Sequence, residues 1–443
     1  MHTINSPCST EAFQANERNQ ARGGSSNREI VLVVGIAFIV RLAVITIGHT
    51  YRITPRRDHF QFGWEMGRLA RSLAQGHGFS SPTDLDSGPS AWTAPFYPFV
   101  LASVFRILGI YSSASAWAIL AFNSVFASLT CGTLYRVAGR IFGNTVAYRG
   151  AWTWAVFPYL IYWPVRVVWE VSFTTFLLTL ILWRAIMLAD QRMPRASDWL
   201  IFGLLWGLMA LTNTAVLILF PCALAWIFYQ LPAGSGRFRA QLLAVVAMLV
   251  LVTPWTIRNY KCFGRLIFIR DNLPLELYEA NNEASGGGWT RSEHPGNDRK
   301  SMARFQQLGE IGFMDEKRRE FDGFIRGHPG KFAWFSLKRV GYFWAAPPQE
   351  TLAGKFQLRI ARHTGFLLAA IFAWAGLALM FALKNPYRWL MAPCLVVYPL
   401  PYYLVNPFPR YKHPIEPIML ILIVYLLGAA GGVELRSRLP RSA

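Results

Sequence analysis

The sequence predicts an all-α polytopic membrane protein with about ten transmembrane helices. Of its 443 residues, 53% are hydrophobic and only 15% are charged, and the mean hydropathy is +0.28. Apolar runs of about 20 residues, the length that crosses a bilayer, recur between Ile30 and Val433. These observations exclude a soluble globular enzyme. The five cysteines form no CxxC motif and no disulfide framework, because three of them lie inside apolar runs.

The first 28 residues are polar and lack the apolar core of a signal peptide, so they are expected to form a disordered cytoplasmic tail. The first predicted span contains Arg41, which either faces the bundle or snorkels to the membrane surface. The ten predicted spans are Ile30–Gly48, Trp117–Tyr135, Val146–Trp163, Val171–Leu188, Trp199–Leu211, Ala215–Tyr229, Ala240–Trp255, Gly365–Leu383, Trp389–Leu404 and Ile415–Gly432.

The short apolar stretch Phe96–Gly109 is the one ambiguous segment, and the basic residues decide its placement. Cytoplasmic loops are enriched in Lys and Arg. If the stretch does not span, sixteen basic residues lie in the inner loops and tails and three in the short outer loops; if it spans, six lie inside and thirteen outside. We therefore expect an interfacial or re-entrant helix on the outer face, although the sequence leaves a span open.

This topology divides the chain into five parts. Residues 1–28 form the tail, 29–255 an N-terminal transmembrane module with the outer loop 50–116, 256–363 an extracytoplasmic loop region, 364–433 the C-terminal helices, and 434–443 a second cytoplasmic tail. The strand-like stretch Leu266–Ile269 predicts a mixed α/β character for the loop region. The formal charge of +20 is explained mainly by topology, so no nucleic-acid partner is expected.

The first outer loop is predicted to contain an amphipathic helix that lies along the membrane surface. Its apolar positions follow i, i+4, i+7, i+11 spacing: Phe62, Met66, Leu69 and Leu73. Asp58 and Glu65 are seven residues apart, so a helix places both carboxylates on one side. Such a pair can hold a divalent cation or supply a general base. The alternative is a solvated face whose acids neutralise Arg57 and Arg68.

Polar residues at the later outer turns complete the candidate site. Glu170 stands at the outer mouth of the fourth span, where a carboxylate is costly unless it is functional or paired, here with Arg166. Arg258 is a candidate phosphate clamp or an interfacial anchor. No HExxH, GxSxG or Walker motif occurs. The candidate substrate-binding residues are Arg258, Asn259, Tyr260, Asn282, Arg410, Tyr411, Lys412 and His413.

In this order and on this topology, several motifs resemble the polyprenyl-phosphate-sugar-dependent glycosyltransferases of the GT-C superfold, in particular bacterial relatives of protein O-mannosyltransferase and aminoarabinose transferase. The motifs cover most of the chain: Gly76-His77-Gly78-Phe79, Ala94-Pro95-Phe96-Tyr97-Pro98, Arg140-Ile141-Phe142-Gly143, Trp169-Glu170, Pro254-Trp255-Thr256-Ile257-Arg258-Asn259-Tyr260 with Gly264, and Arg410-Tyr411 with Pro414 and Pro417.

The resemblance implies that a sugar is transferred with inversion from a lipid-phosphate donor to an acceptor hydroxyl of a lipid, glycan or protein, outside the plasma (inner) membrane. It implies a first-loop acid that acts as base or metal ligand and a second acid that Glu170 matches. Counting back from Gly76 places the first acid near Phe62, between Asp58 and Glu65, so both are kept. Whether a divalent metal ion is required stays open; Asp58 or Glu65 would then be the ligand.

Two other functions fit the same outer loops. A transporter or flippase for lipid-linked sugars would carry polar or broken helices near the membrane midplane, whereas the unusual acids here gather at one surface. A ligase that transfers a whole glycan from its lipid carrier would differ from a sugar transferase only in donor and acceptor, which the sequence does not identify.

Overall fold

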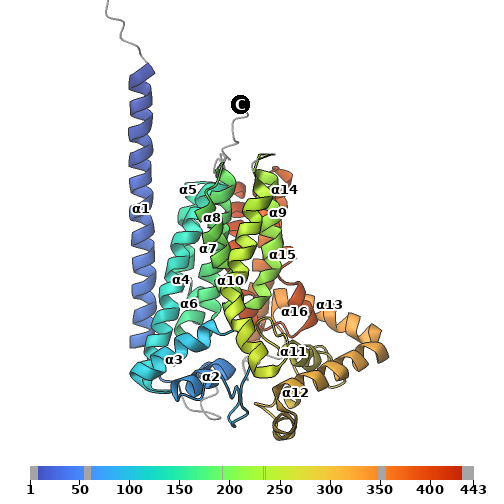
Figure 1. Ribbon diagram of the computed structural model, residues 1–443. Coiled ribbons are helices and arrows are strands. Elements are labelled where there is room, and N and C mark those ends of the chain that lie inside the picture. Colours follow the sequence, from blue (N-terminus) through green and yellow to red (C-terminus); the bar gives the residue numbers. More distant parts are fainter. Residues whose placement is uncertain are drawn as a thin grey trace, which may run out of the picture.

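The chain's structure is a computed structural model that describes residues 8–53, 61–191, 193–232, 234, 236–347 and 356–431, with side chains described from residue 27 and not for 356–359. Long helices pack side by side, and short helices gather at one end of the bundle (Figure 1). Within the described residues there are helices and one isolated β-bridge, between Ser80 and Pro89, but no strand.

Six helical segments are long and apolar enough to cross a membrane. They are Asn27–Ile47 of α1 (Cys8–Ile47), Ser113–Phe142 (α4), Val171–Asp190 (α7), Arg237–Phe263 (α10), Ile360–Ala382 of α14 (Phe356–Ala382), and Pro409–Ala430, which includes α17 (Glu416–Ala430). The chain is thus a multi-pass membrane protein.

The other four predicted spans coincide with shorter or interrupted helices. They are α5 (Asn144–Val156) with α6 (Pro158–Arg166), α8 (Ala196–Thr212), η1 (Thr214–Leu219) with α9 (Phe220–Gln230), and α15 (Arg388–Val396) with α16 (Leu400–Leu404). Every predicted apolar stretch is therefore at least partly helical, while the count of ten spans stays a prediction.

Arg41 of α1 faces the bundle, where it compensates for a break between α5 and α6. Pro158 has no N–H group, so it cannot donate to the carbonyl oxygen of Trp154 one turn earlier. The guanidinium of Arg41, which is fully buried, donates through Nη2 to Trp154 O and through Nη1 to Ala155 O, each at 3.0 Å. Of the two positions that the sequence allowed for Arg41, the structure selects the buried one.

Replacing Arg41 with leucine is expected to destabilise the protein by about 2–4 kcal/mol, because two carbonyl groups lose their donors in an environment without water. The measurement is the thermal unfolding midpoint of the protein purified in detergent. Arg149→Leu is the matched control, since Arg149 is exposed on α5. Equal midpoints for the two variants would contradict the role assigned to Arg41.

Glycines allow two pairs of helices to approach closely. A Cβ atom added to Gly203 of α8 would collide with the backbone of Ala244 in α10, and one added to Gly207 would lie 3.1 Å from the carbonyl oxygen of Met248. Gly376 of α14 likewise meets the backbone of Leu422 in α17. The spacing of Gly203 and Gly207 is that of a small-xxx-small packing motif of membrane helices.

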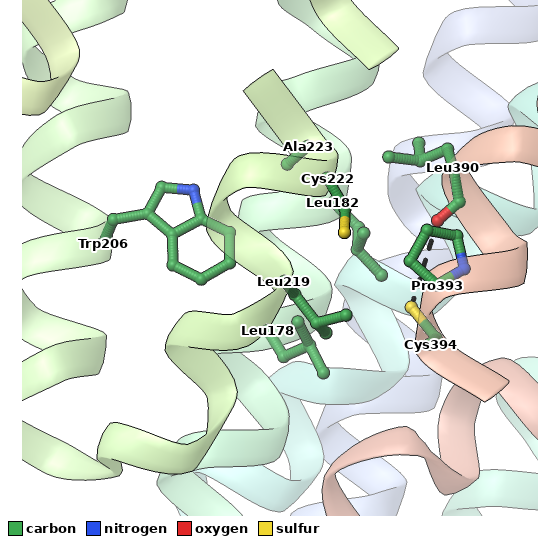
Figure 2. A pocket seen from close by; sticks show the side chains of 9 residues that line it. All are labelled: Leu178, Leu182, Trp206, Leu219, Cys222, Ala223, Leu390, Pro393 and Cys394. Carbon is green, nitrogen blue, oxygen red and sulfur yellow. Dashed lines mark hydrogen bonds between the residues drawn. The ribbon is translucent and has the colours of Figure 1, made fainter. Parts of the chain in front are cut away.

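An apolar pocket lies inside the bundle, between α7, α8, η1, α9 and α15 (Figure 2). Among the residues drawn in Figure 2 there is one hydrogen bond, which Cys394 Sγ donates to Leu390 O at 4.0 Å. No charged side chain lines it, so acid–base chemistry has no place there. The lining residues are Leu178, Leu182, Trp206, Leu219, Cys222, Ala223, Leu390, Pro393 and Cys394.

The helical segments at the lower end of the bundle in Figure 1 come from the predicted outer segments. They are α2 (Trp64–Ala74), α3 (Phe96–Leu108), α11 (Leu273–Ala280), η2 (Arg291–Glu293), α12 (Arg299–Gly327), α13 (Pro329–Ala345), η3 (Pro409–Tyr411) and η4 (His413–Ile415). Hydrogen bonds join these segments: Asp271 N donates to Ala91 O, and Asn281 Nδ2 donates to Leu404 O.

The first outer loop contains the predicted amphipathic helix, α2. Met66 and Leu69 are buried, and Met66 belongs to a cluster with Leu101 and Phe105 of α3. α3 has 13 residues and is therefore about 20 Å long, shorter than the roughly 30 Å hydrocarbon core of a bilayer. This length supports an interfacial or re-entrant position for α3.

The predicted mixed α/β character of the outer segment is corrected, because its described residues, 256–347, contain no strand. The stretch Leu266–Ile269 pairs with side chains of α10. Trp255 Nε1 and Thr256 Oγ1 donate to the carbonyl oxygens of residues 269 and 268, at 2.9 and 2.8 Å, and Asn259 Nδ2 donates to those of residues 267 and 269. These side chains satisfy the backbone that a neighbouring strand would otherwise satisfy.

Candidate functional site

Two of the three predicted acids are brought together through neighbouring tryptophans. Glu65 lies in the first turn of α2, and Glu170 directly precedes α7. The rings of Trp64 and Trp169, one residue before each acid, meet edge to face with centroids 5.0 Å apart. Both carboxyl groups are buried. Asp58 lies outside the described residues, so its role stays a prediction. The single helix that was expected to carry both acids is corrected, because α2 begins only at Trp64, after Gly63 with a φ of 100°.

The carboxylate of Glu65 pairs with His294, which follows η2. His294 Nε2 lies 3.2 Å from Glu65 Oε1, and His294 Nδ1 accepts the N–H of Gly296 at 3.0 Å. Burial is the largest single effect and raises the pKa of Glu65, but the hydrogen bond and charge of His294, its own backbone N–H and the charge of Arg68 together lower the pKa below its ordinary value. Glu65 is therefore ionised at neutral pH. Sequence analysis missed His294, which stands alone in an irregular segment.

The protonation of His294 is set by opposing effects. Burial lowers the pKa of His294, while the carboxyl groups of Glu279 and Glu65 favour the imidazolium and raise the pKa to about 9. The N–H of Gly296, which points at Nδ1, favours the neutral ring. The rings of Trp92 and Trp289 flank the imidazole, with centroids 5.6 and 6.4 Å away. His294 is thus held in place on several sides.

Glu279 of α11 is another residue of the site that no sequence pattern marks. It is buried, its Oε2 accepts the indole N–H of Trp289 at 2.9 Å, and its Oε1 has no hydrogen bond within the described part of the chain. Burial raises the pKa of Glu279 to about 8. The protonation of Glu279 is linked to that of His294, because an ionised Glu279 favours the imidazolium and the imidazolium lowers the pKa of Glu279.

Glu170 occupies a different environment on the other side of Trp169. Its Oε1 accepts a hydrogen bond from Asn213 Nδ2 at 3.3 Å, while its Oε2 is buried with no hydrogen bond to any described residue. Burial raises the pKa of Glu170 to about 7, against the opposing effects of its backbone N–H and of Arg410 and Arg270. A carboxyl group with this pKa can exchange a proton near neutral pH.

Arg410, in η3, is the cation of the site. Its guanidinium lies 4.4 Å from the ring centroids of both Trp169 and Phe408, and Nη2 donates to the hydroxyl of Tyr411 at 3.3 Å. Its Nε is buried without a hydrogen bond to the described residues. Stacking of this kind fixes the guanidinium while leaving N–H groups for an anion.

The contacts around Glu65, His294 and Arg410 form a closed ring, because the rings of Trp289 and Phe408 meet with centroids 5.7 Å apart. Each residue of this ring contacts the next one or is adjacent to it in the chain. We call these seven residues the site rim: Glu65, His294, Trp289, Phe408, Arg410, Trp169 and Trp64. The rim unites an acid, a histidine, aromatic rings and an arginine from four stretches of the chain: 64–65, 169, 289–294 and 408–410.

Two other predicted binding residues have backbone partners in the outer loops. Arg258 donates from Nη1 to Ser90 O at 2.6 Å and from Nη2 to Phe79 O at 2.7 Å. Asn259 is fully buried and holds the stretch after α10. Their observed contacts are those of residues that position loops, so a direct role with substrate stays a prediction.

The remaining predicted residues are spread over several environments. Lys412 is buried, with Nζ 3.9 Å from the ring centroid of Phe366, and His413 is buried with Nδ1 2.7 Å from Glu416 Oε2. Tyr260 is 57% exposed on α10. The last one, Asn282, is buried and donates to the carbonyl oxygen of residue 278 and the hydroxyl of residue 290.

No three His, Cys, Asp or Glu side chains in the described ranges come together as a metal site requires. Glu65, a possible ligand, has His294 as its nearest ionisable partner. The other possible ligand, Asp58, lies in the segment 54–60, which the structure does not describe, so the expectation about a divalent ion stays untested.

Comparison with known proteins identifies the fold. Residues 92–257 match the family described as dolichyl-phosphate-mannose-protein mannosyltransferase. The oligosaccharyltransferase AglB from Archaeoglobus fulgidus, in complex with an inhibitory peptide and a dolichol-phosphate, superposes with a TM-score of 0.54 at 15% identity, over 90% of this chain and 50% of that chain. Its apo form gives 0.53 at 13% identity, over the same shares.

A weaker similarity, with a TM-score of 0.37 at 15% identity, is to ArnT from Cupriavidus metallidurans bound to undecaprenyl phosphate, over 91% of this chain and 78% of that one. No curated protein sequence matches the chain. The chain spans about half the length of the archaeal oligosaccharyltransferase, and at such identities the likeness concerns the fold. The resemblance seen in the sequence is confirmed: the chain is a multi-pass membrane protein with the GT-C glycosyltransferase fold.

Proposed function

We propose that the protein transfers a sugar from a polyprenyl-phosphate donor to an acceptor hydroxyl at the outer face of the plasma membrane. The observation that carries the proposal is the site rim, where the ionised Glu65, the nearby Glu170 and the stacked Arg410 lie at one end of the bundle. The archaeal protein of the same fold was solved with a dolichol-phosphate, and this supports a lipid-phosphate donor here.

The transfer needs little covalent assistance, because a polyprenyl phosphate is a good leaving group. The acceptor oxygen forms a bond to the anomeric carbon as the bond from that carbon to the phosphate oxygen breaks. Glu65 or Asp58 takes the acceptor proton, and Arg410 stabilises the phosphate as it leaves. Glu170, with a pKa near neutrality, is the second acid that can take up or return a proton.

The two rival functions are less well supported by the charges. A transporter would place polar groups near the membrane midplane. The guanidinium of Arg41, which lies within the first candidate span, is already bonded to backbone carbonyls. A ligase for whole glycans would have the same fold, as the archaeal oligosaccharyltransferase has. It would differ from a transferase of single sugars in the donor that it accepts. The acceptor class, whether lipid, glycan or protein, is left to the assay.

The test is the transfer of radiolabelled sugar from synthetic polyprenyl-phosphate donors by the purified protein in nanodiscs. Glu65→Gln is expected to lower turnover by about 10²–10⁴-fold, and Arg410→Gln to raise the KM for the donor. Asp58→Asn compares the two first-loop acids, and addition of a chelator tests for a metal ion. Glu316→Gln is the control, because Glu316 pairs with Arg304 on the surface of α12.

Transfer of a lipid-linked oligosaccharide, with none from the monosaccharide donors, would favour the ligase. Unchanged turnover in all the acid variants would refute the site assignment.

The outward orientation has its own test. Cys262, near the end of α10, is exposed, whereas Cys131 and Cys394 are buried. An impermeant thiol reagent is expected to label Cys262 in intact cells, and Cys262→Ser to remove that label. Labelling of Cys262 only after lysis would place the site rim on the cytoplasmic side and overturn the topology.

A further inference from the structure

Two residues with buried carboxyl groups, Glu310 and Asp271, bind the backbone of one residue of the first outer loop, Ala91. Glu310 lies in α12 directly after Gly309, whose φ of 68° bends the helix at that point. The carboxyl Oε1 of Glu310 accepts the N–H of Ala91 at 2.5 Å, and the N–H of Asp271 donates to the carbonyl oxygen of Ala91 at 3.0 Å. Both polar groups of the Ala91 backbone are thus bound by this pair of residues.

The two carboxyl groups lie close enough to shift each other's pKa, and the hydroxyl of Ser90 also acts on Glu310. Oε2 of Glu310 and both carboxyl oxygens of Asp271 are buried without a hydrogen bond to the described residues. Ionised carboxylates only accept hydrogen bonds, so two of them facing each other repel unless a proton or a cation lies between them.

The surrounding charges favour a proton over a metal ion. Arg258, Arg265 and Arg270 all lie within electrostatic reach of the pair. These cations partly neutralise one remaining negative charge, and they would repel a divalent ion. Arg265 also binds Asp315 at 2.7 Å, where both side chains are exposed, so a group of surface charges borders the buried carboxyl pair.

Asp271 and Glu310 hold the segment Ala91–Trp92, which lines one side of the site. Trp92 directly follows Ala91, and its ring packs on Phe305 of α12 and on His294, with centroids 5.6 Å away in both cases. The imidazole of His294 in turn contacts Glu65. Movement of Ala91 would therefore displace the ring that supports His294.

We propose that Asp271 and Glu310 share one proton, and that this shared proton positions Trp92 against His294 and makes the order of the site dependent on pH. The second half of this proposal rests on the proposed function, while the shared proton does not. Asp271 and Glu310 are accordingly positioning residues, because they reach the reacting groups only through Trp92 and His294.

The direction of the pH effect follows from burial. Burial raises the pKa of Asp271 to about 6 and that of Glu310 well above its ordinary value. Groups with raised pKa values stabilise the fold when protonated, so the clamp on Ala91 is complete in weak acid and is lost as the pH rises and the shared proton dissociates.

The test is hydrogen–deuterium exchange of the peptide that contains Ala91 and Trp92, in the full-length protein in nanodiscs. In the wild type, protection corrected for intrinsic exchange is expected to fall at least tenfold between weakly acidic and alkaline pH. Glu310→Gln keeps an acceptor for Ala91 and gains a donor for Asp271, so its protection should not vary with pH. Asp271→Asn supplies the same donor from the other side.

Glu310→Ala is expected to lose protection at every pH, whereas Glu316→Gln, on the surface of α12, should behave as the wild type. A flat wild-type profile, or the wild-type pH dependence in Glu310→Gln and Asp271→Asn, would overturn the shared proton. Protection that depends on added calcium or on chelator would assign the site to a metal ion instead.

Transfer activity separates this proposal from the proposed function. If the protein transfers sugar, Glu310→Gln should retain transfer at the alkaline pH at which the wild type loses it. If no donor is used while the exchange results hold, the shared proton stands and the proposed function fails. If transfer occurs but the loss at alkaline pH is the same in Glu310→Gln, the positioning role is refuted.

Discussion

Replacing Glu170 with glutamine is expected to lower the turnover of sugar transfer by about 10²–10⁴-fold, the usual contribution of a general acid or base. Glutamine keeps the oxygen that accepts the hydrogen bond from Asn213, so the fold and the place of the side chain should be preserved. Glutamine cannot exchange a proton, however, and it carries no charge to balance Arg410. The measurement is steady-state transfer by the purified protein.

The pH profile makes the prediction for Glu170 more specific. If its ionised form is the active one, turnover rises with pH through the pKa of about 7, and this limb is absent in Glu170→Gln. The same raised pKa means that ionisation costs stability, so the contribution of Glu170 to folding falls as the pH rises through that value. Asp190→Asn, which removes a carboxylate paired with Arg140 elsewhere, should leave turnover unchanged. Wild-type turnover in Glu170→Gln would remove Glu170 from the mechanism.

Replacing Arg339 with methionine is expected to destabilise the protein by about 3–5 kcal/mol, because several buried acceptors lose their donor together. Arg339 lies in α13 with its side chain fully buried. Its guanidinium donates to five acceptors: Gly287 O, Tyr403 O, Leu404 O, Ala280 O and Asn281 Oδ1. One side chain therefore holds α13 to the end of α11 and to α16.

Thermal unfolding in detergent measures this loss. Lys338→Met is the matched control from the neighbouring position, since Lys338 is only partly buried and its Nζ donates to one acceptor, Gly286 O, at 3.1 Å. A change below about 1 kcal/mol is expected for it. Similar unfolding temperatures for the two variants would show that the hydrogen bonds of Arg339 contribute little.

The parts of the fold that the sequence predicted correctly depend on local patterns. Apolar runs marked the long helices, and the spacing of Phe62, Met66 and Leu69 marked α2, because burial on one side of a helix repeats every three or four residues. The position of Glu170 directly before α7 followed from a charge at the edge of an apolar run. These patterns involve residues that are close in sequence, so they can be recognised without knowledge of the tertiary structure.

The features that were missed or misjudged depend on contacts between distant segments. His294 and Glu279 stand in stretches without periodicity, and they join Glu65 only because the segment around η2 packs against α2. The expected strand at 266–269 is absent because the side chain of Asn259 occupies its carbonyl groups. Pro158 breaks the predicted span Val146–Trp163 into α5 and α6, and its compensation by Arg41 of α1 requires a contact across more than a hundred residues.

The site rim also sets a lower limit on how much of the chain an active fragment must contain. Its members begin at Trp64 and end at Arg410, and the segment 92–257 that matches the mannosyltransferase family holds only Trp169 of the seven. A fragment cut to that matched segment would keep Glu170 and lose Arg410, His294 and the first-loop acid. Complementation by two co-expressed pieces, split in a loop and reassembled in the membrane, is therefore a better route to a minimal system than truncation.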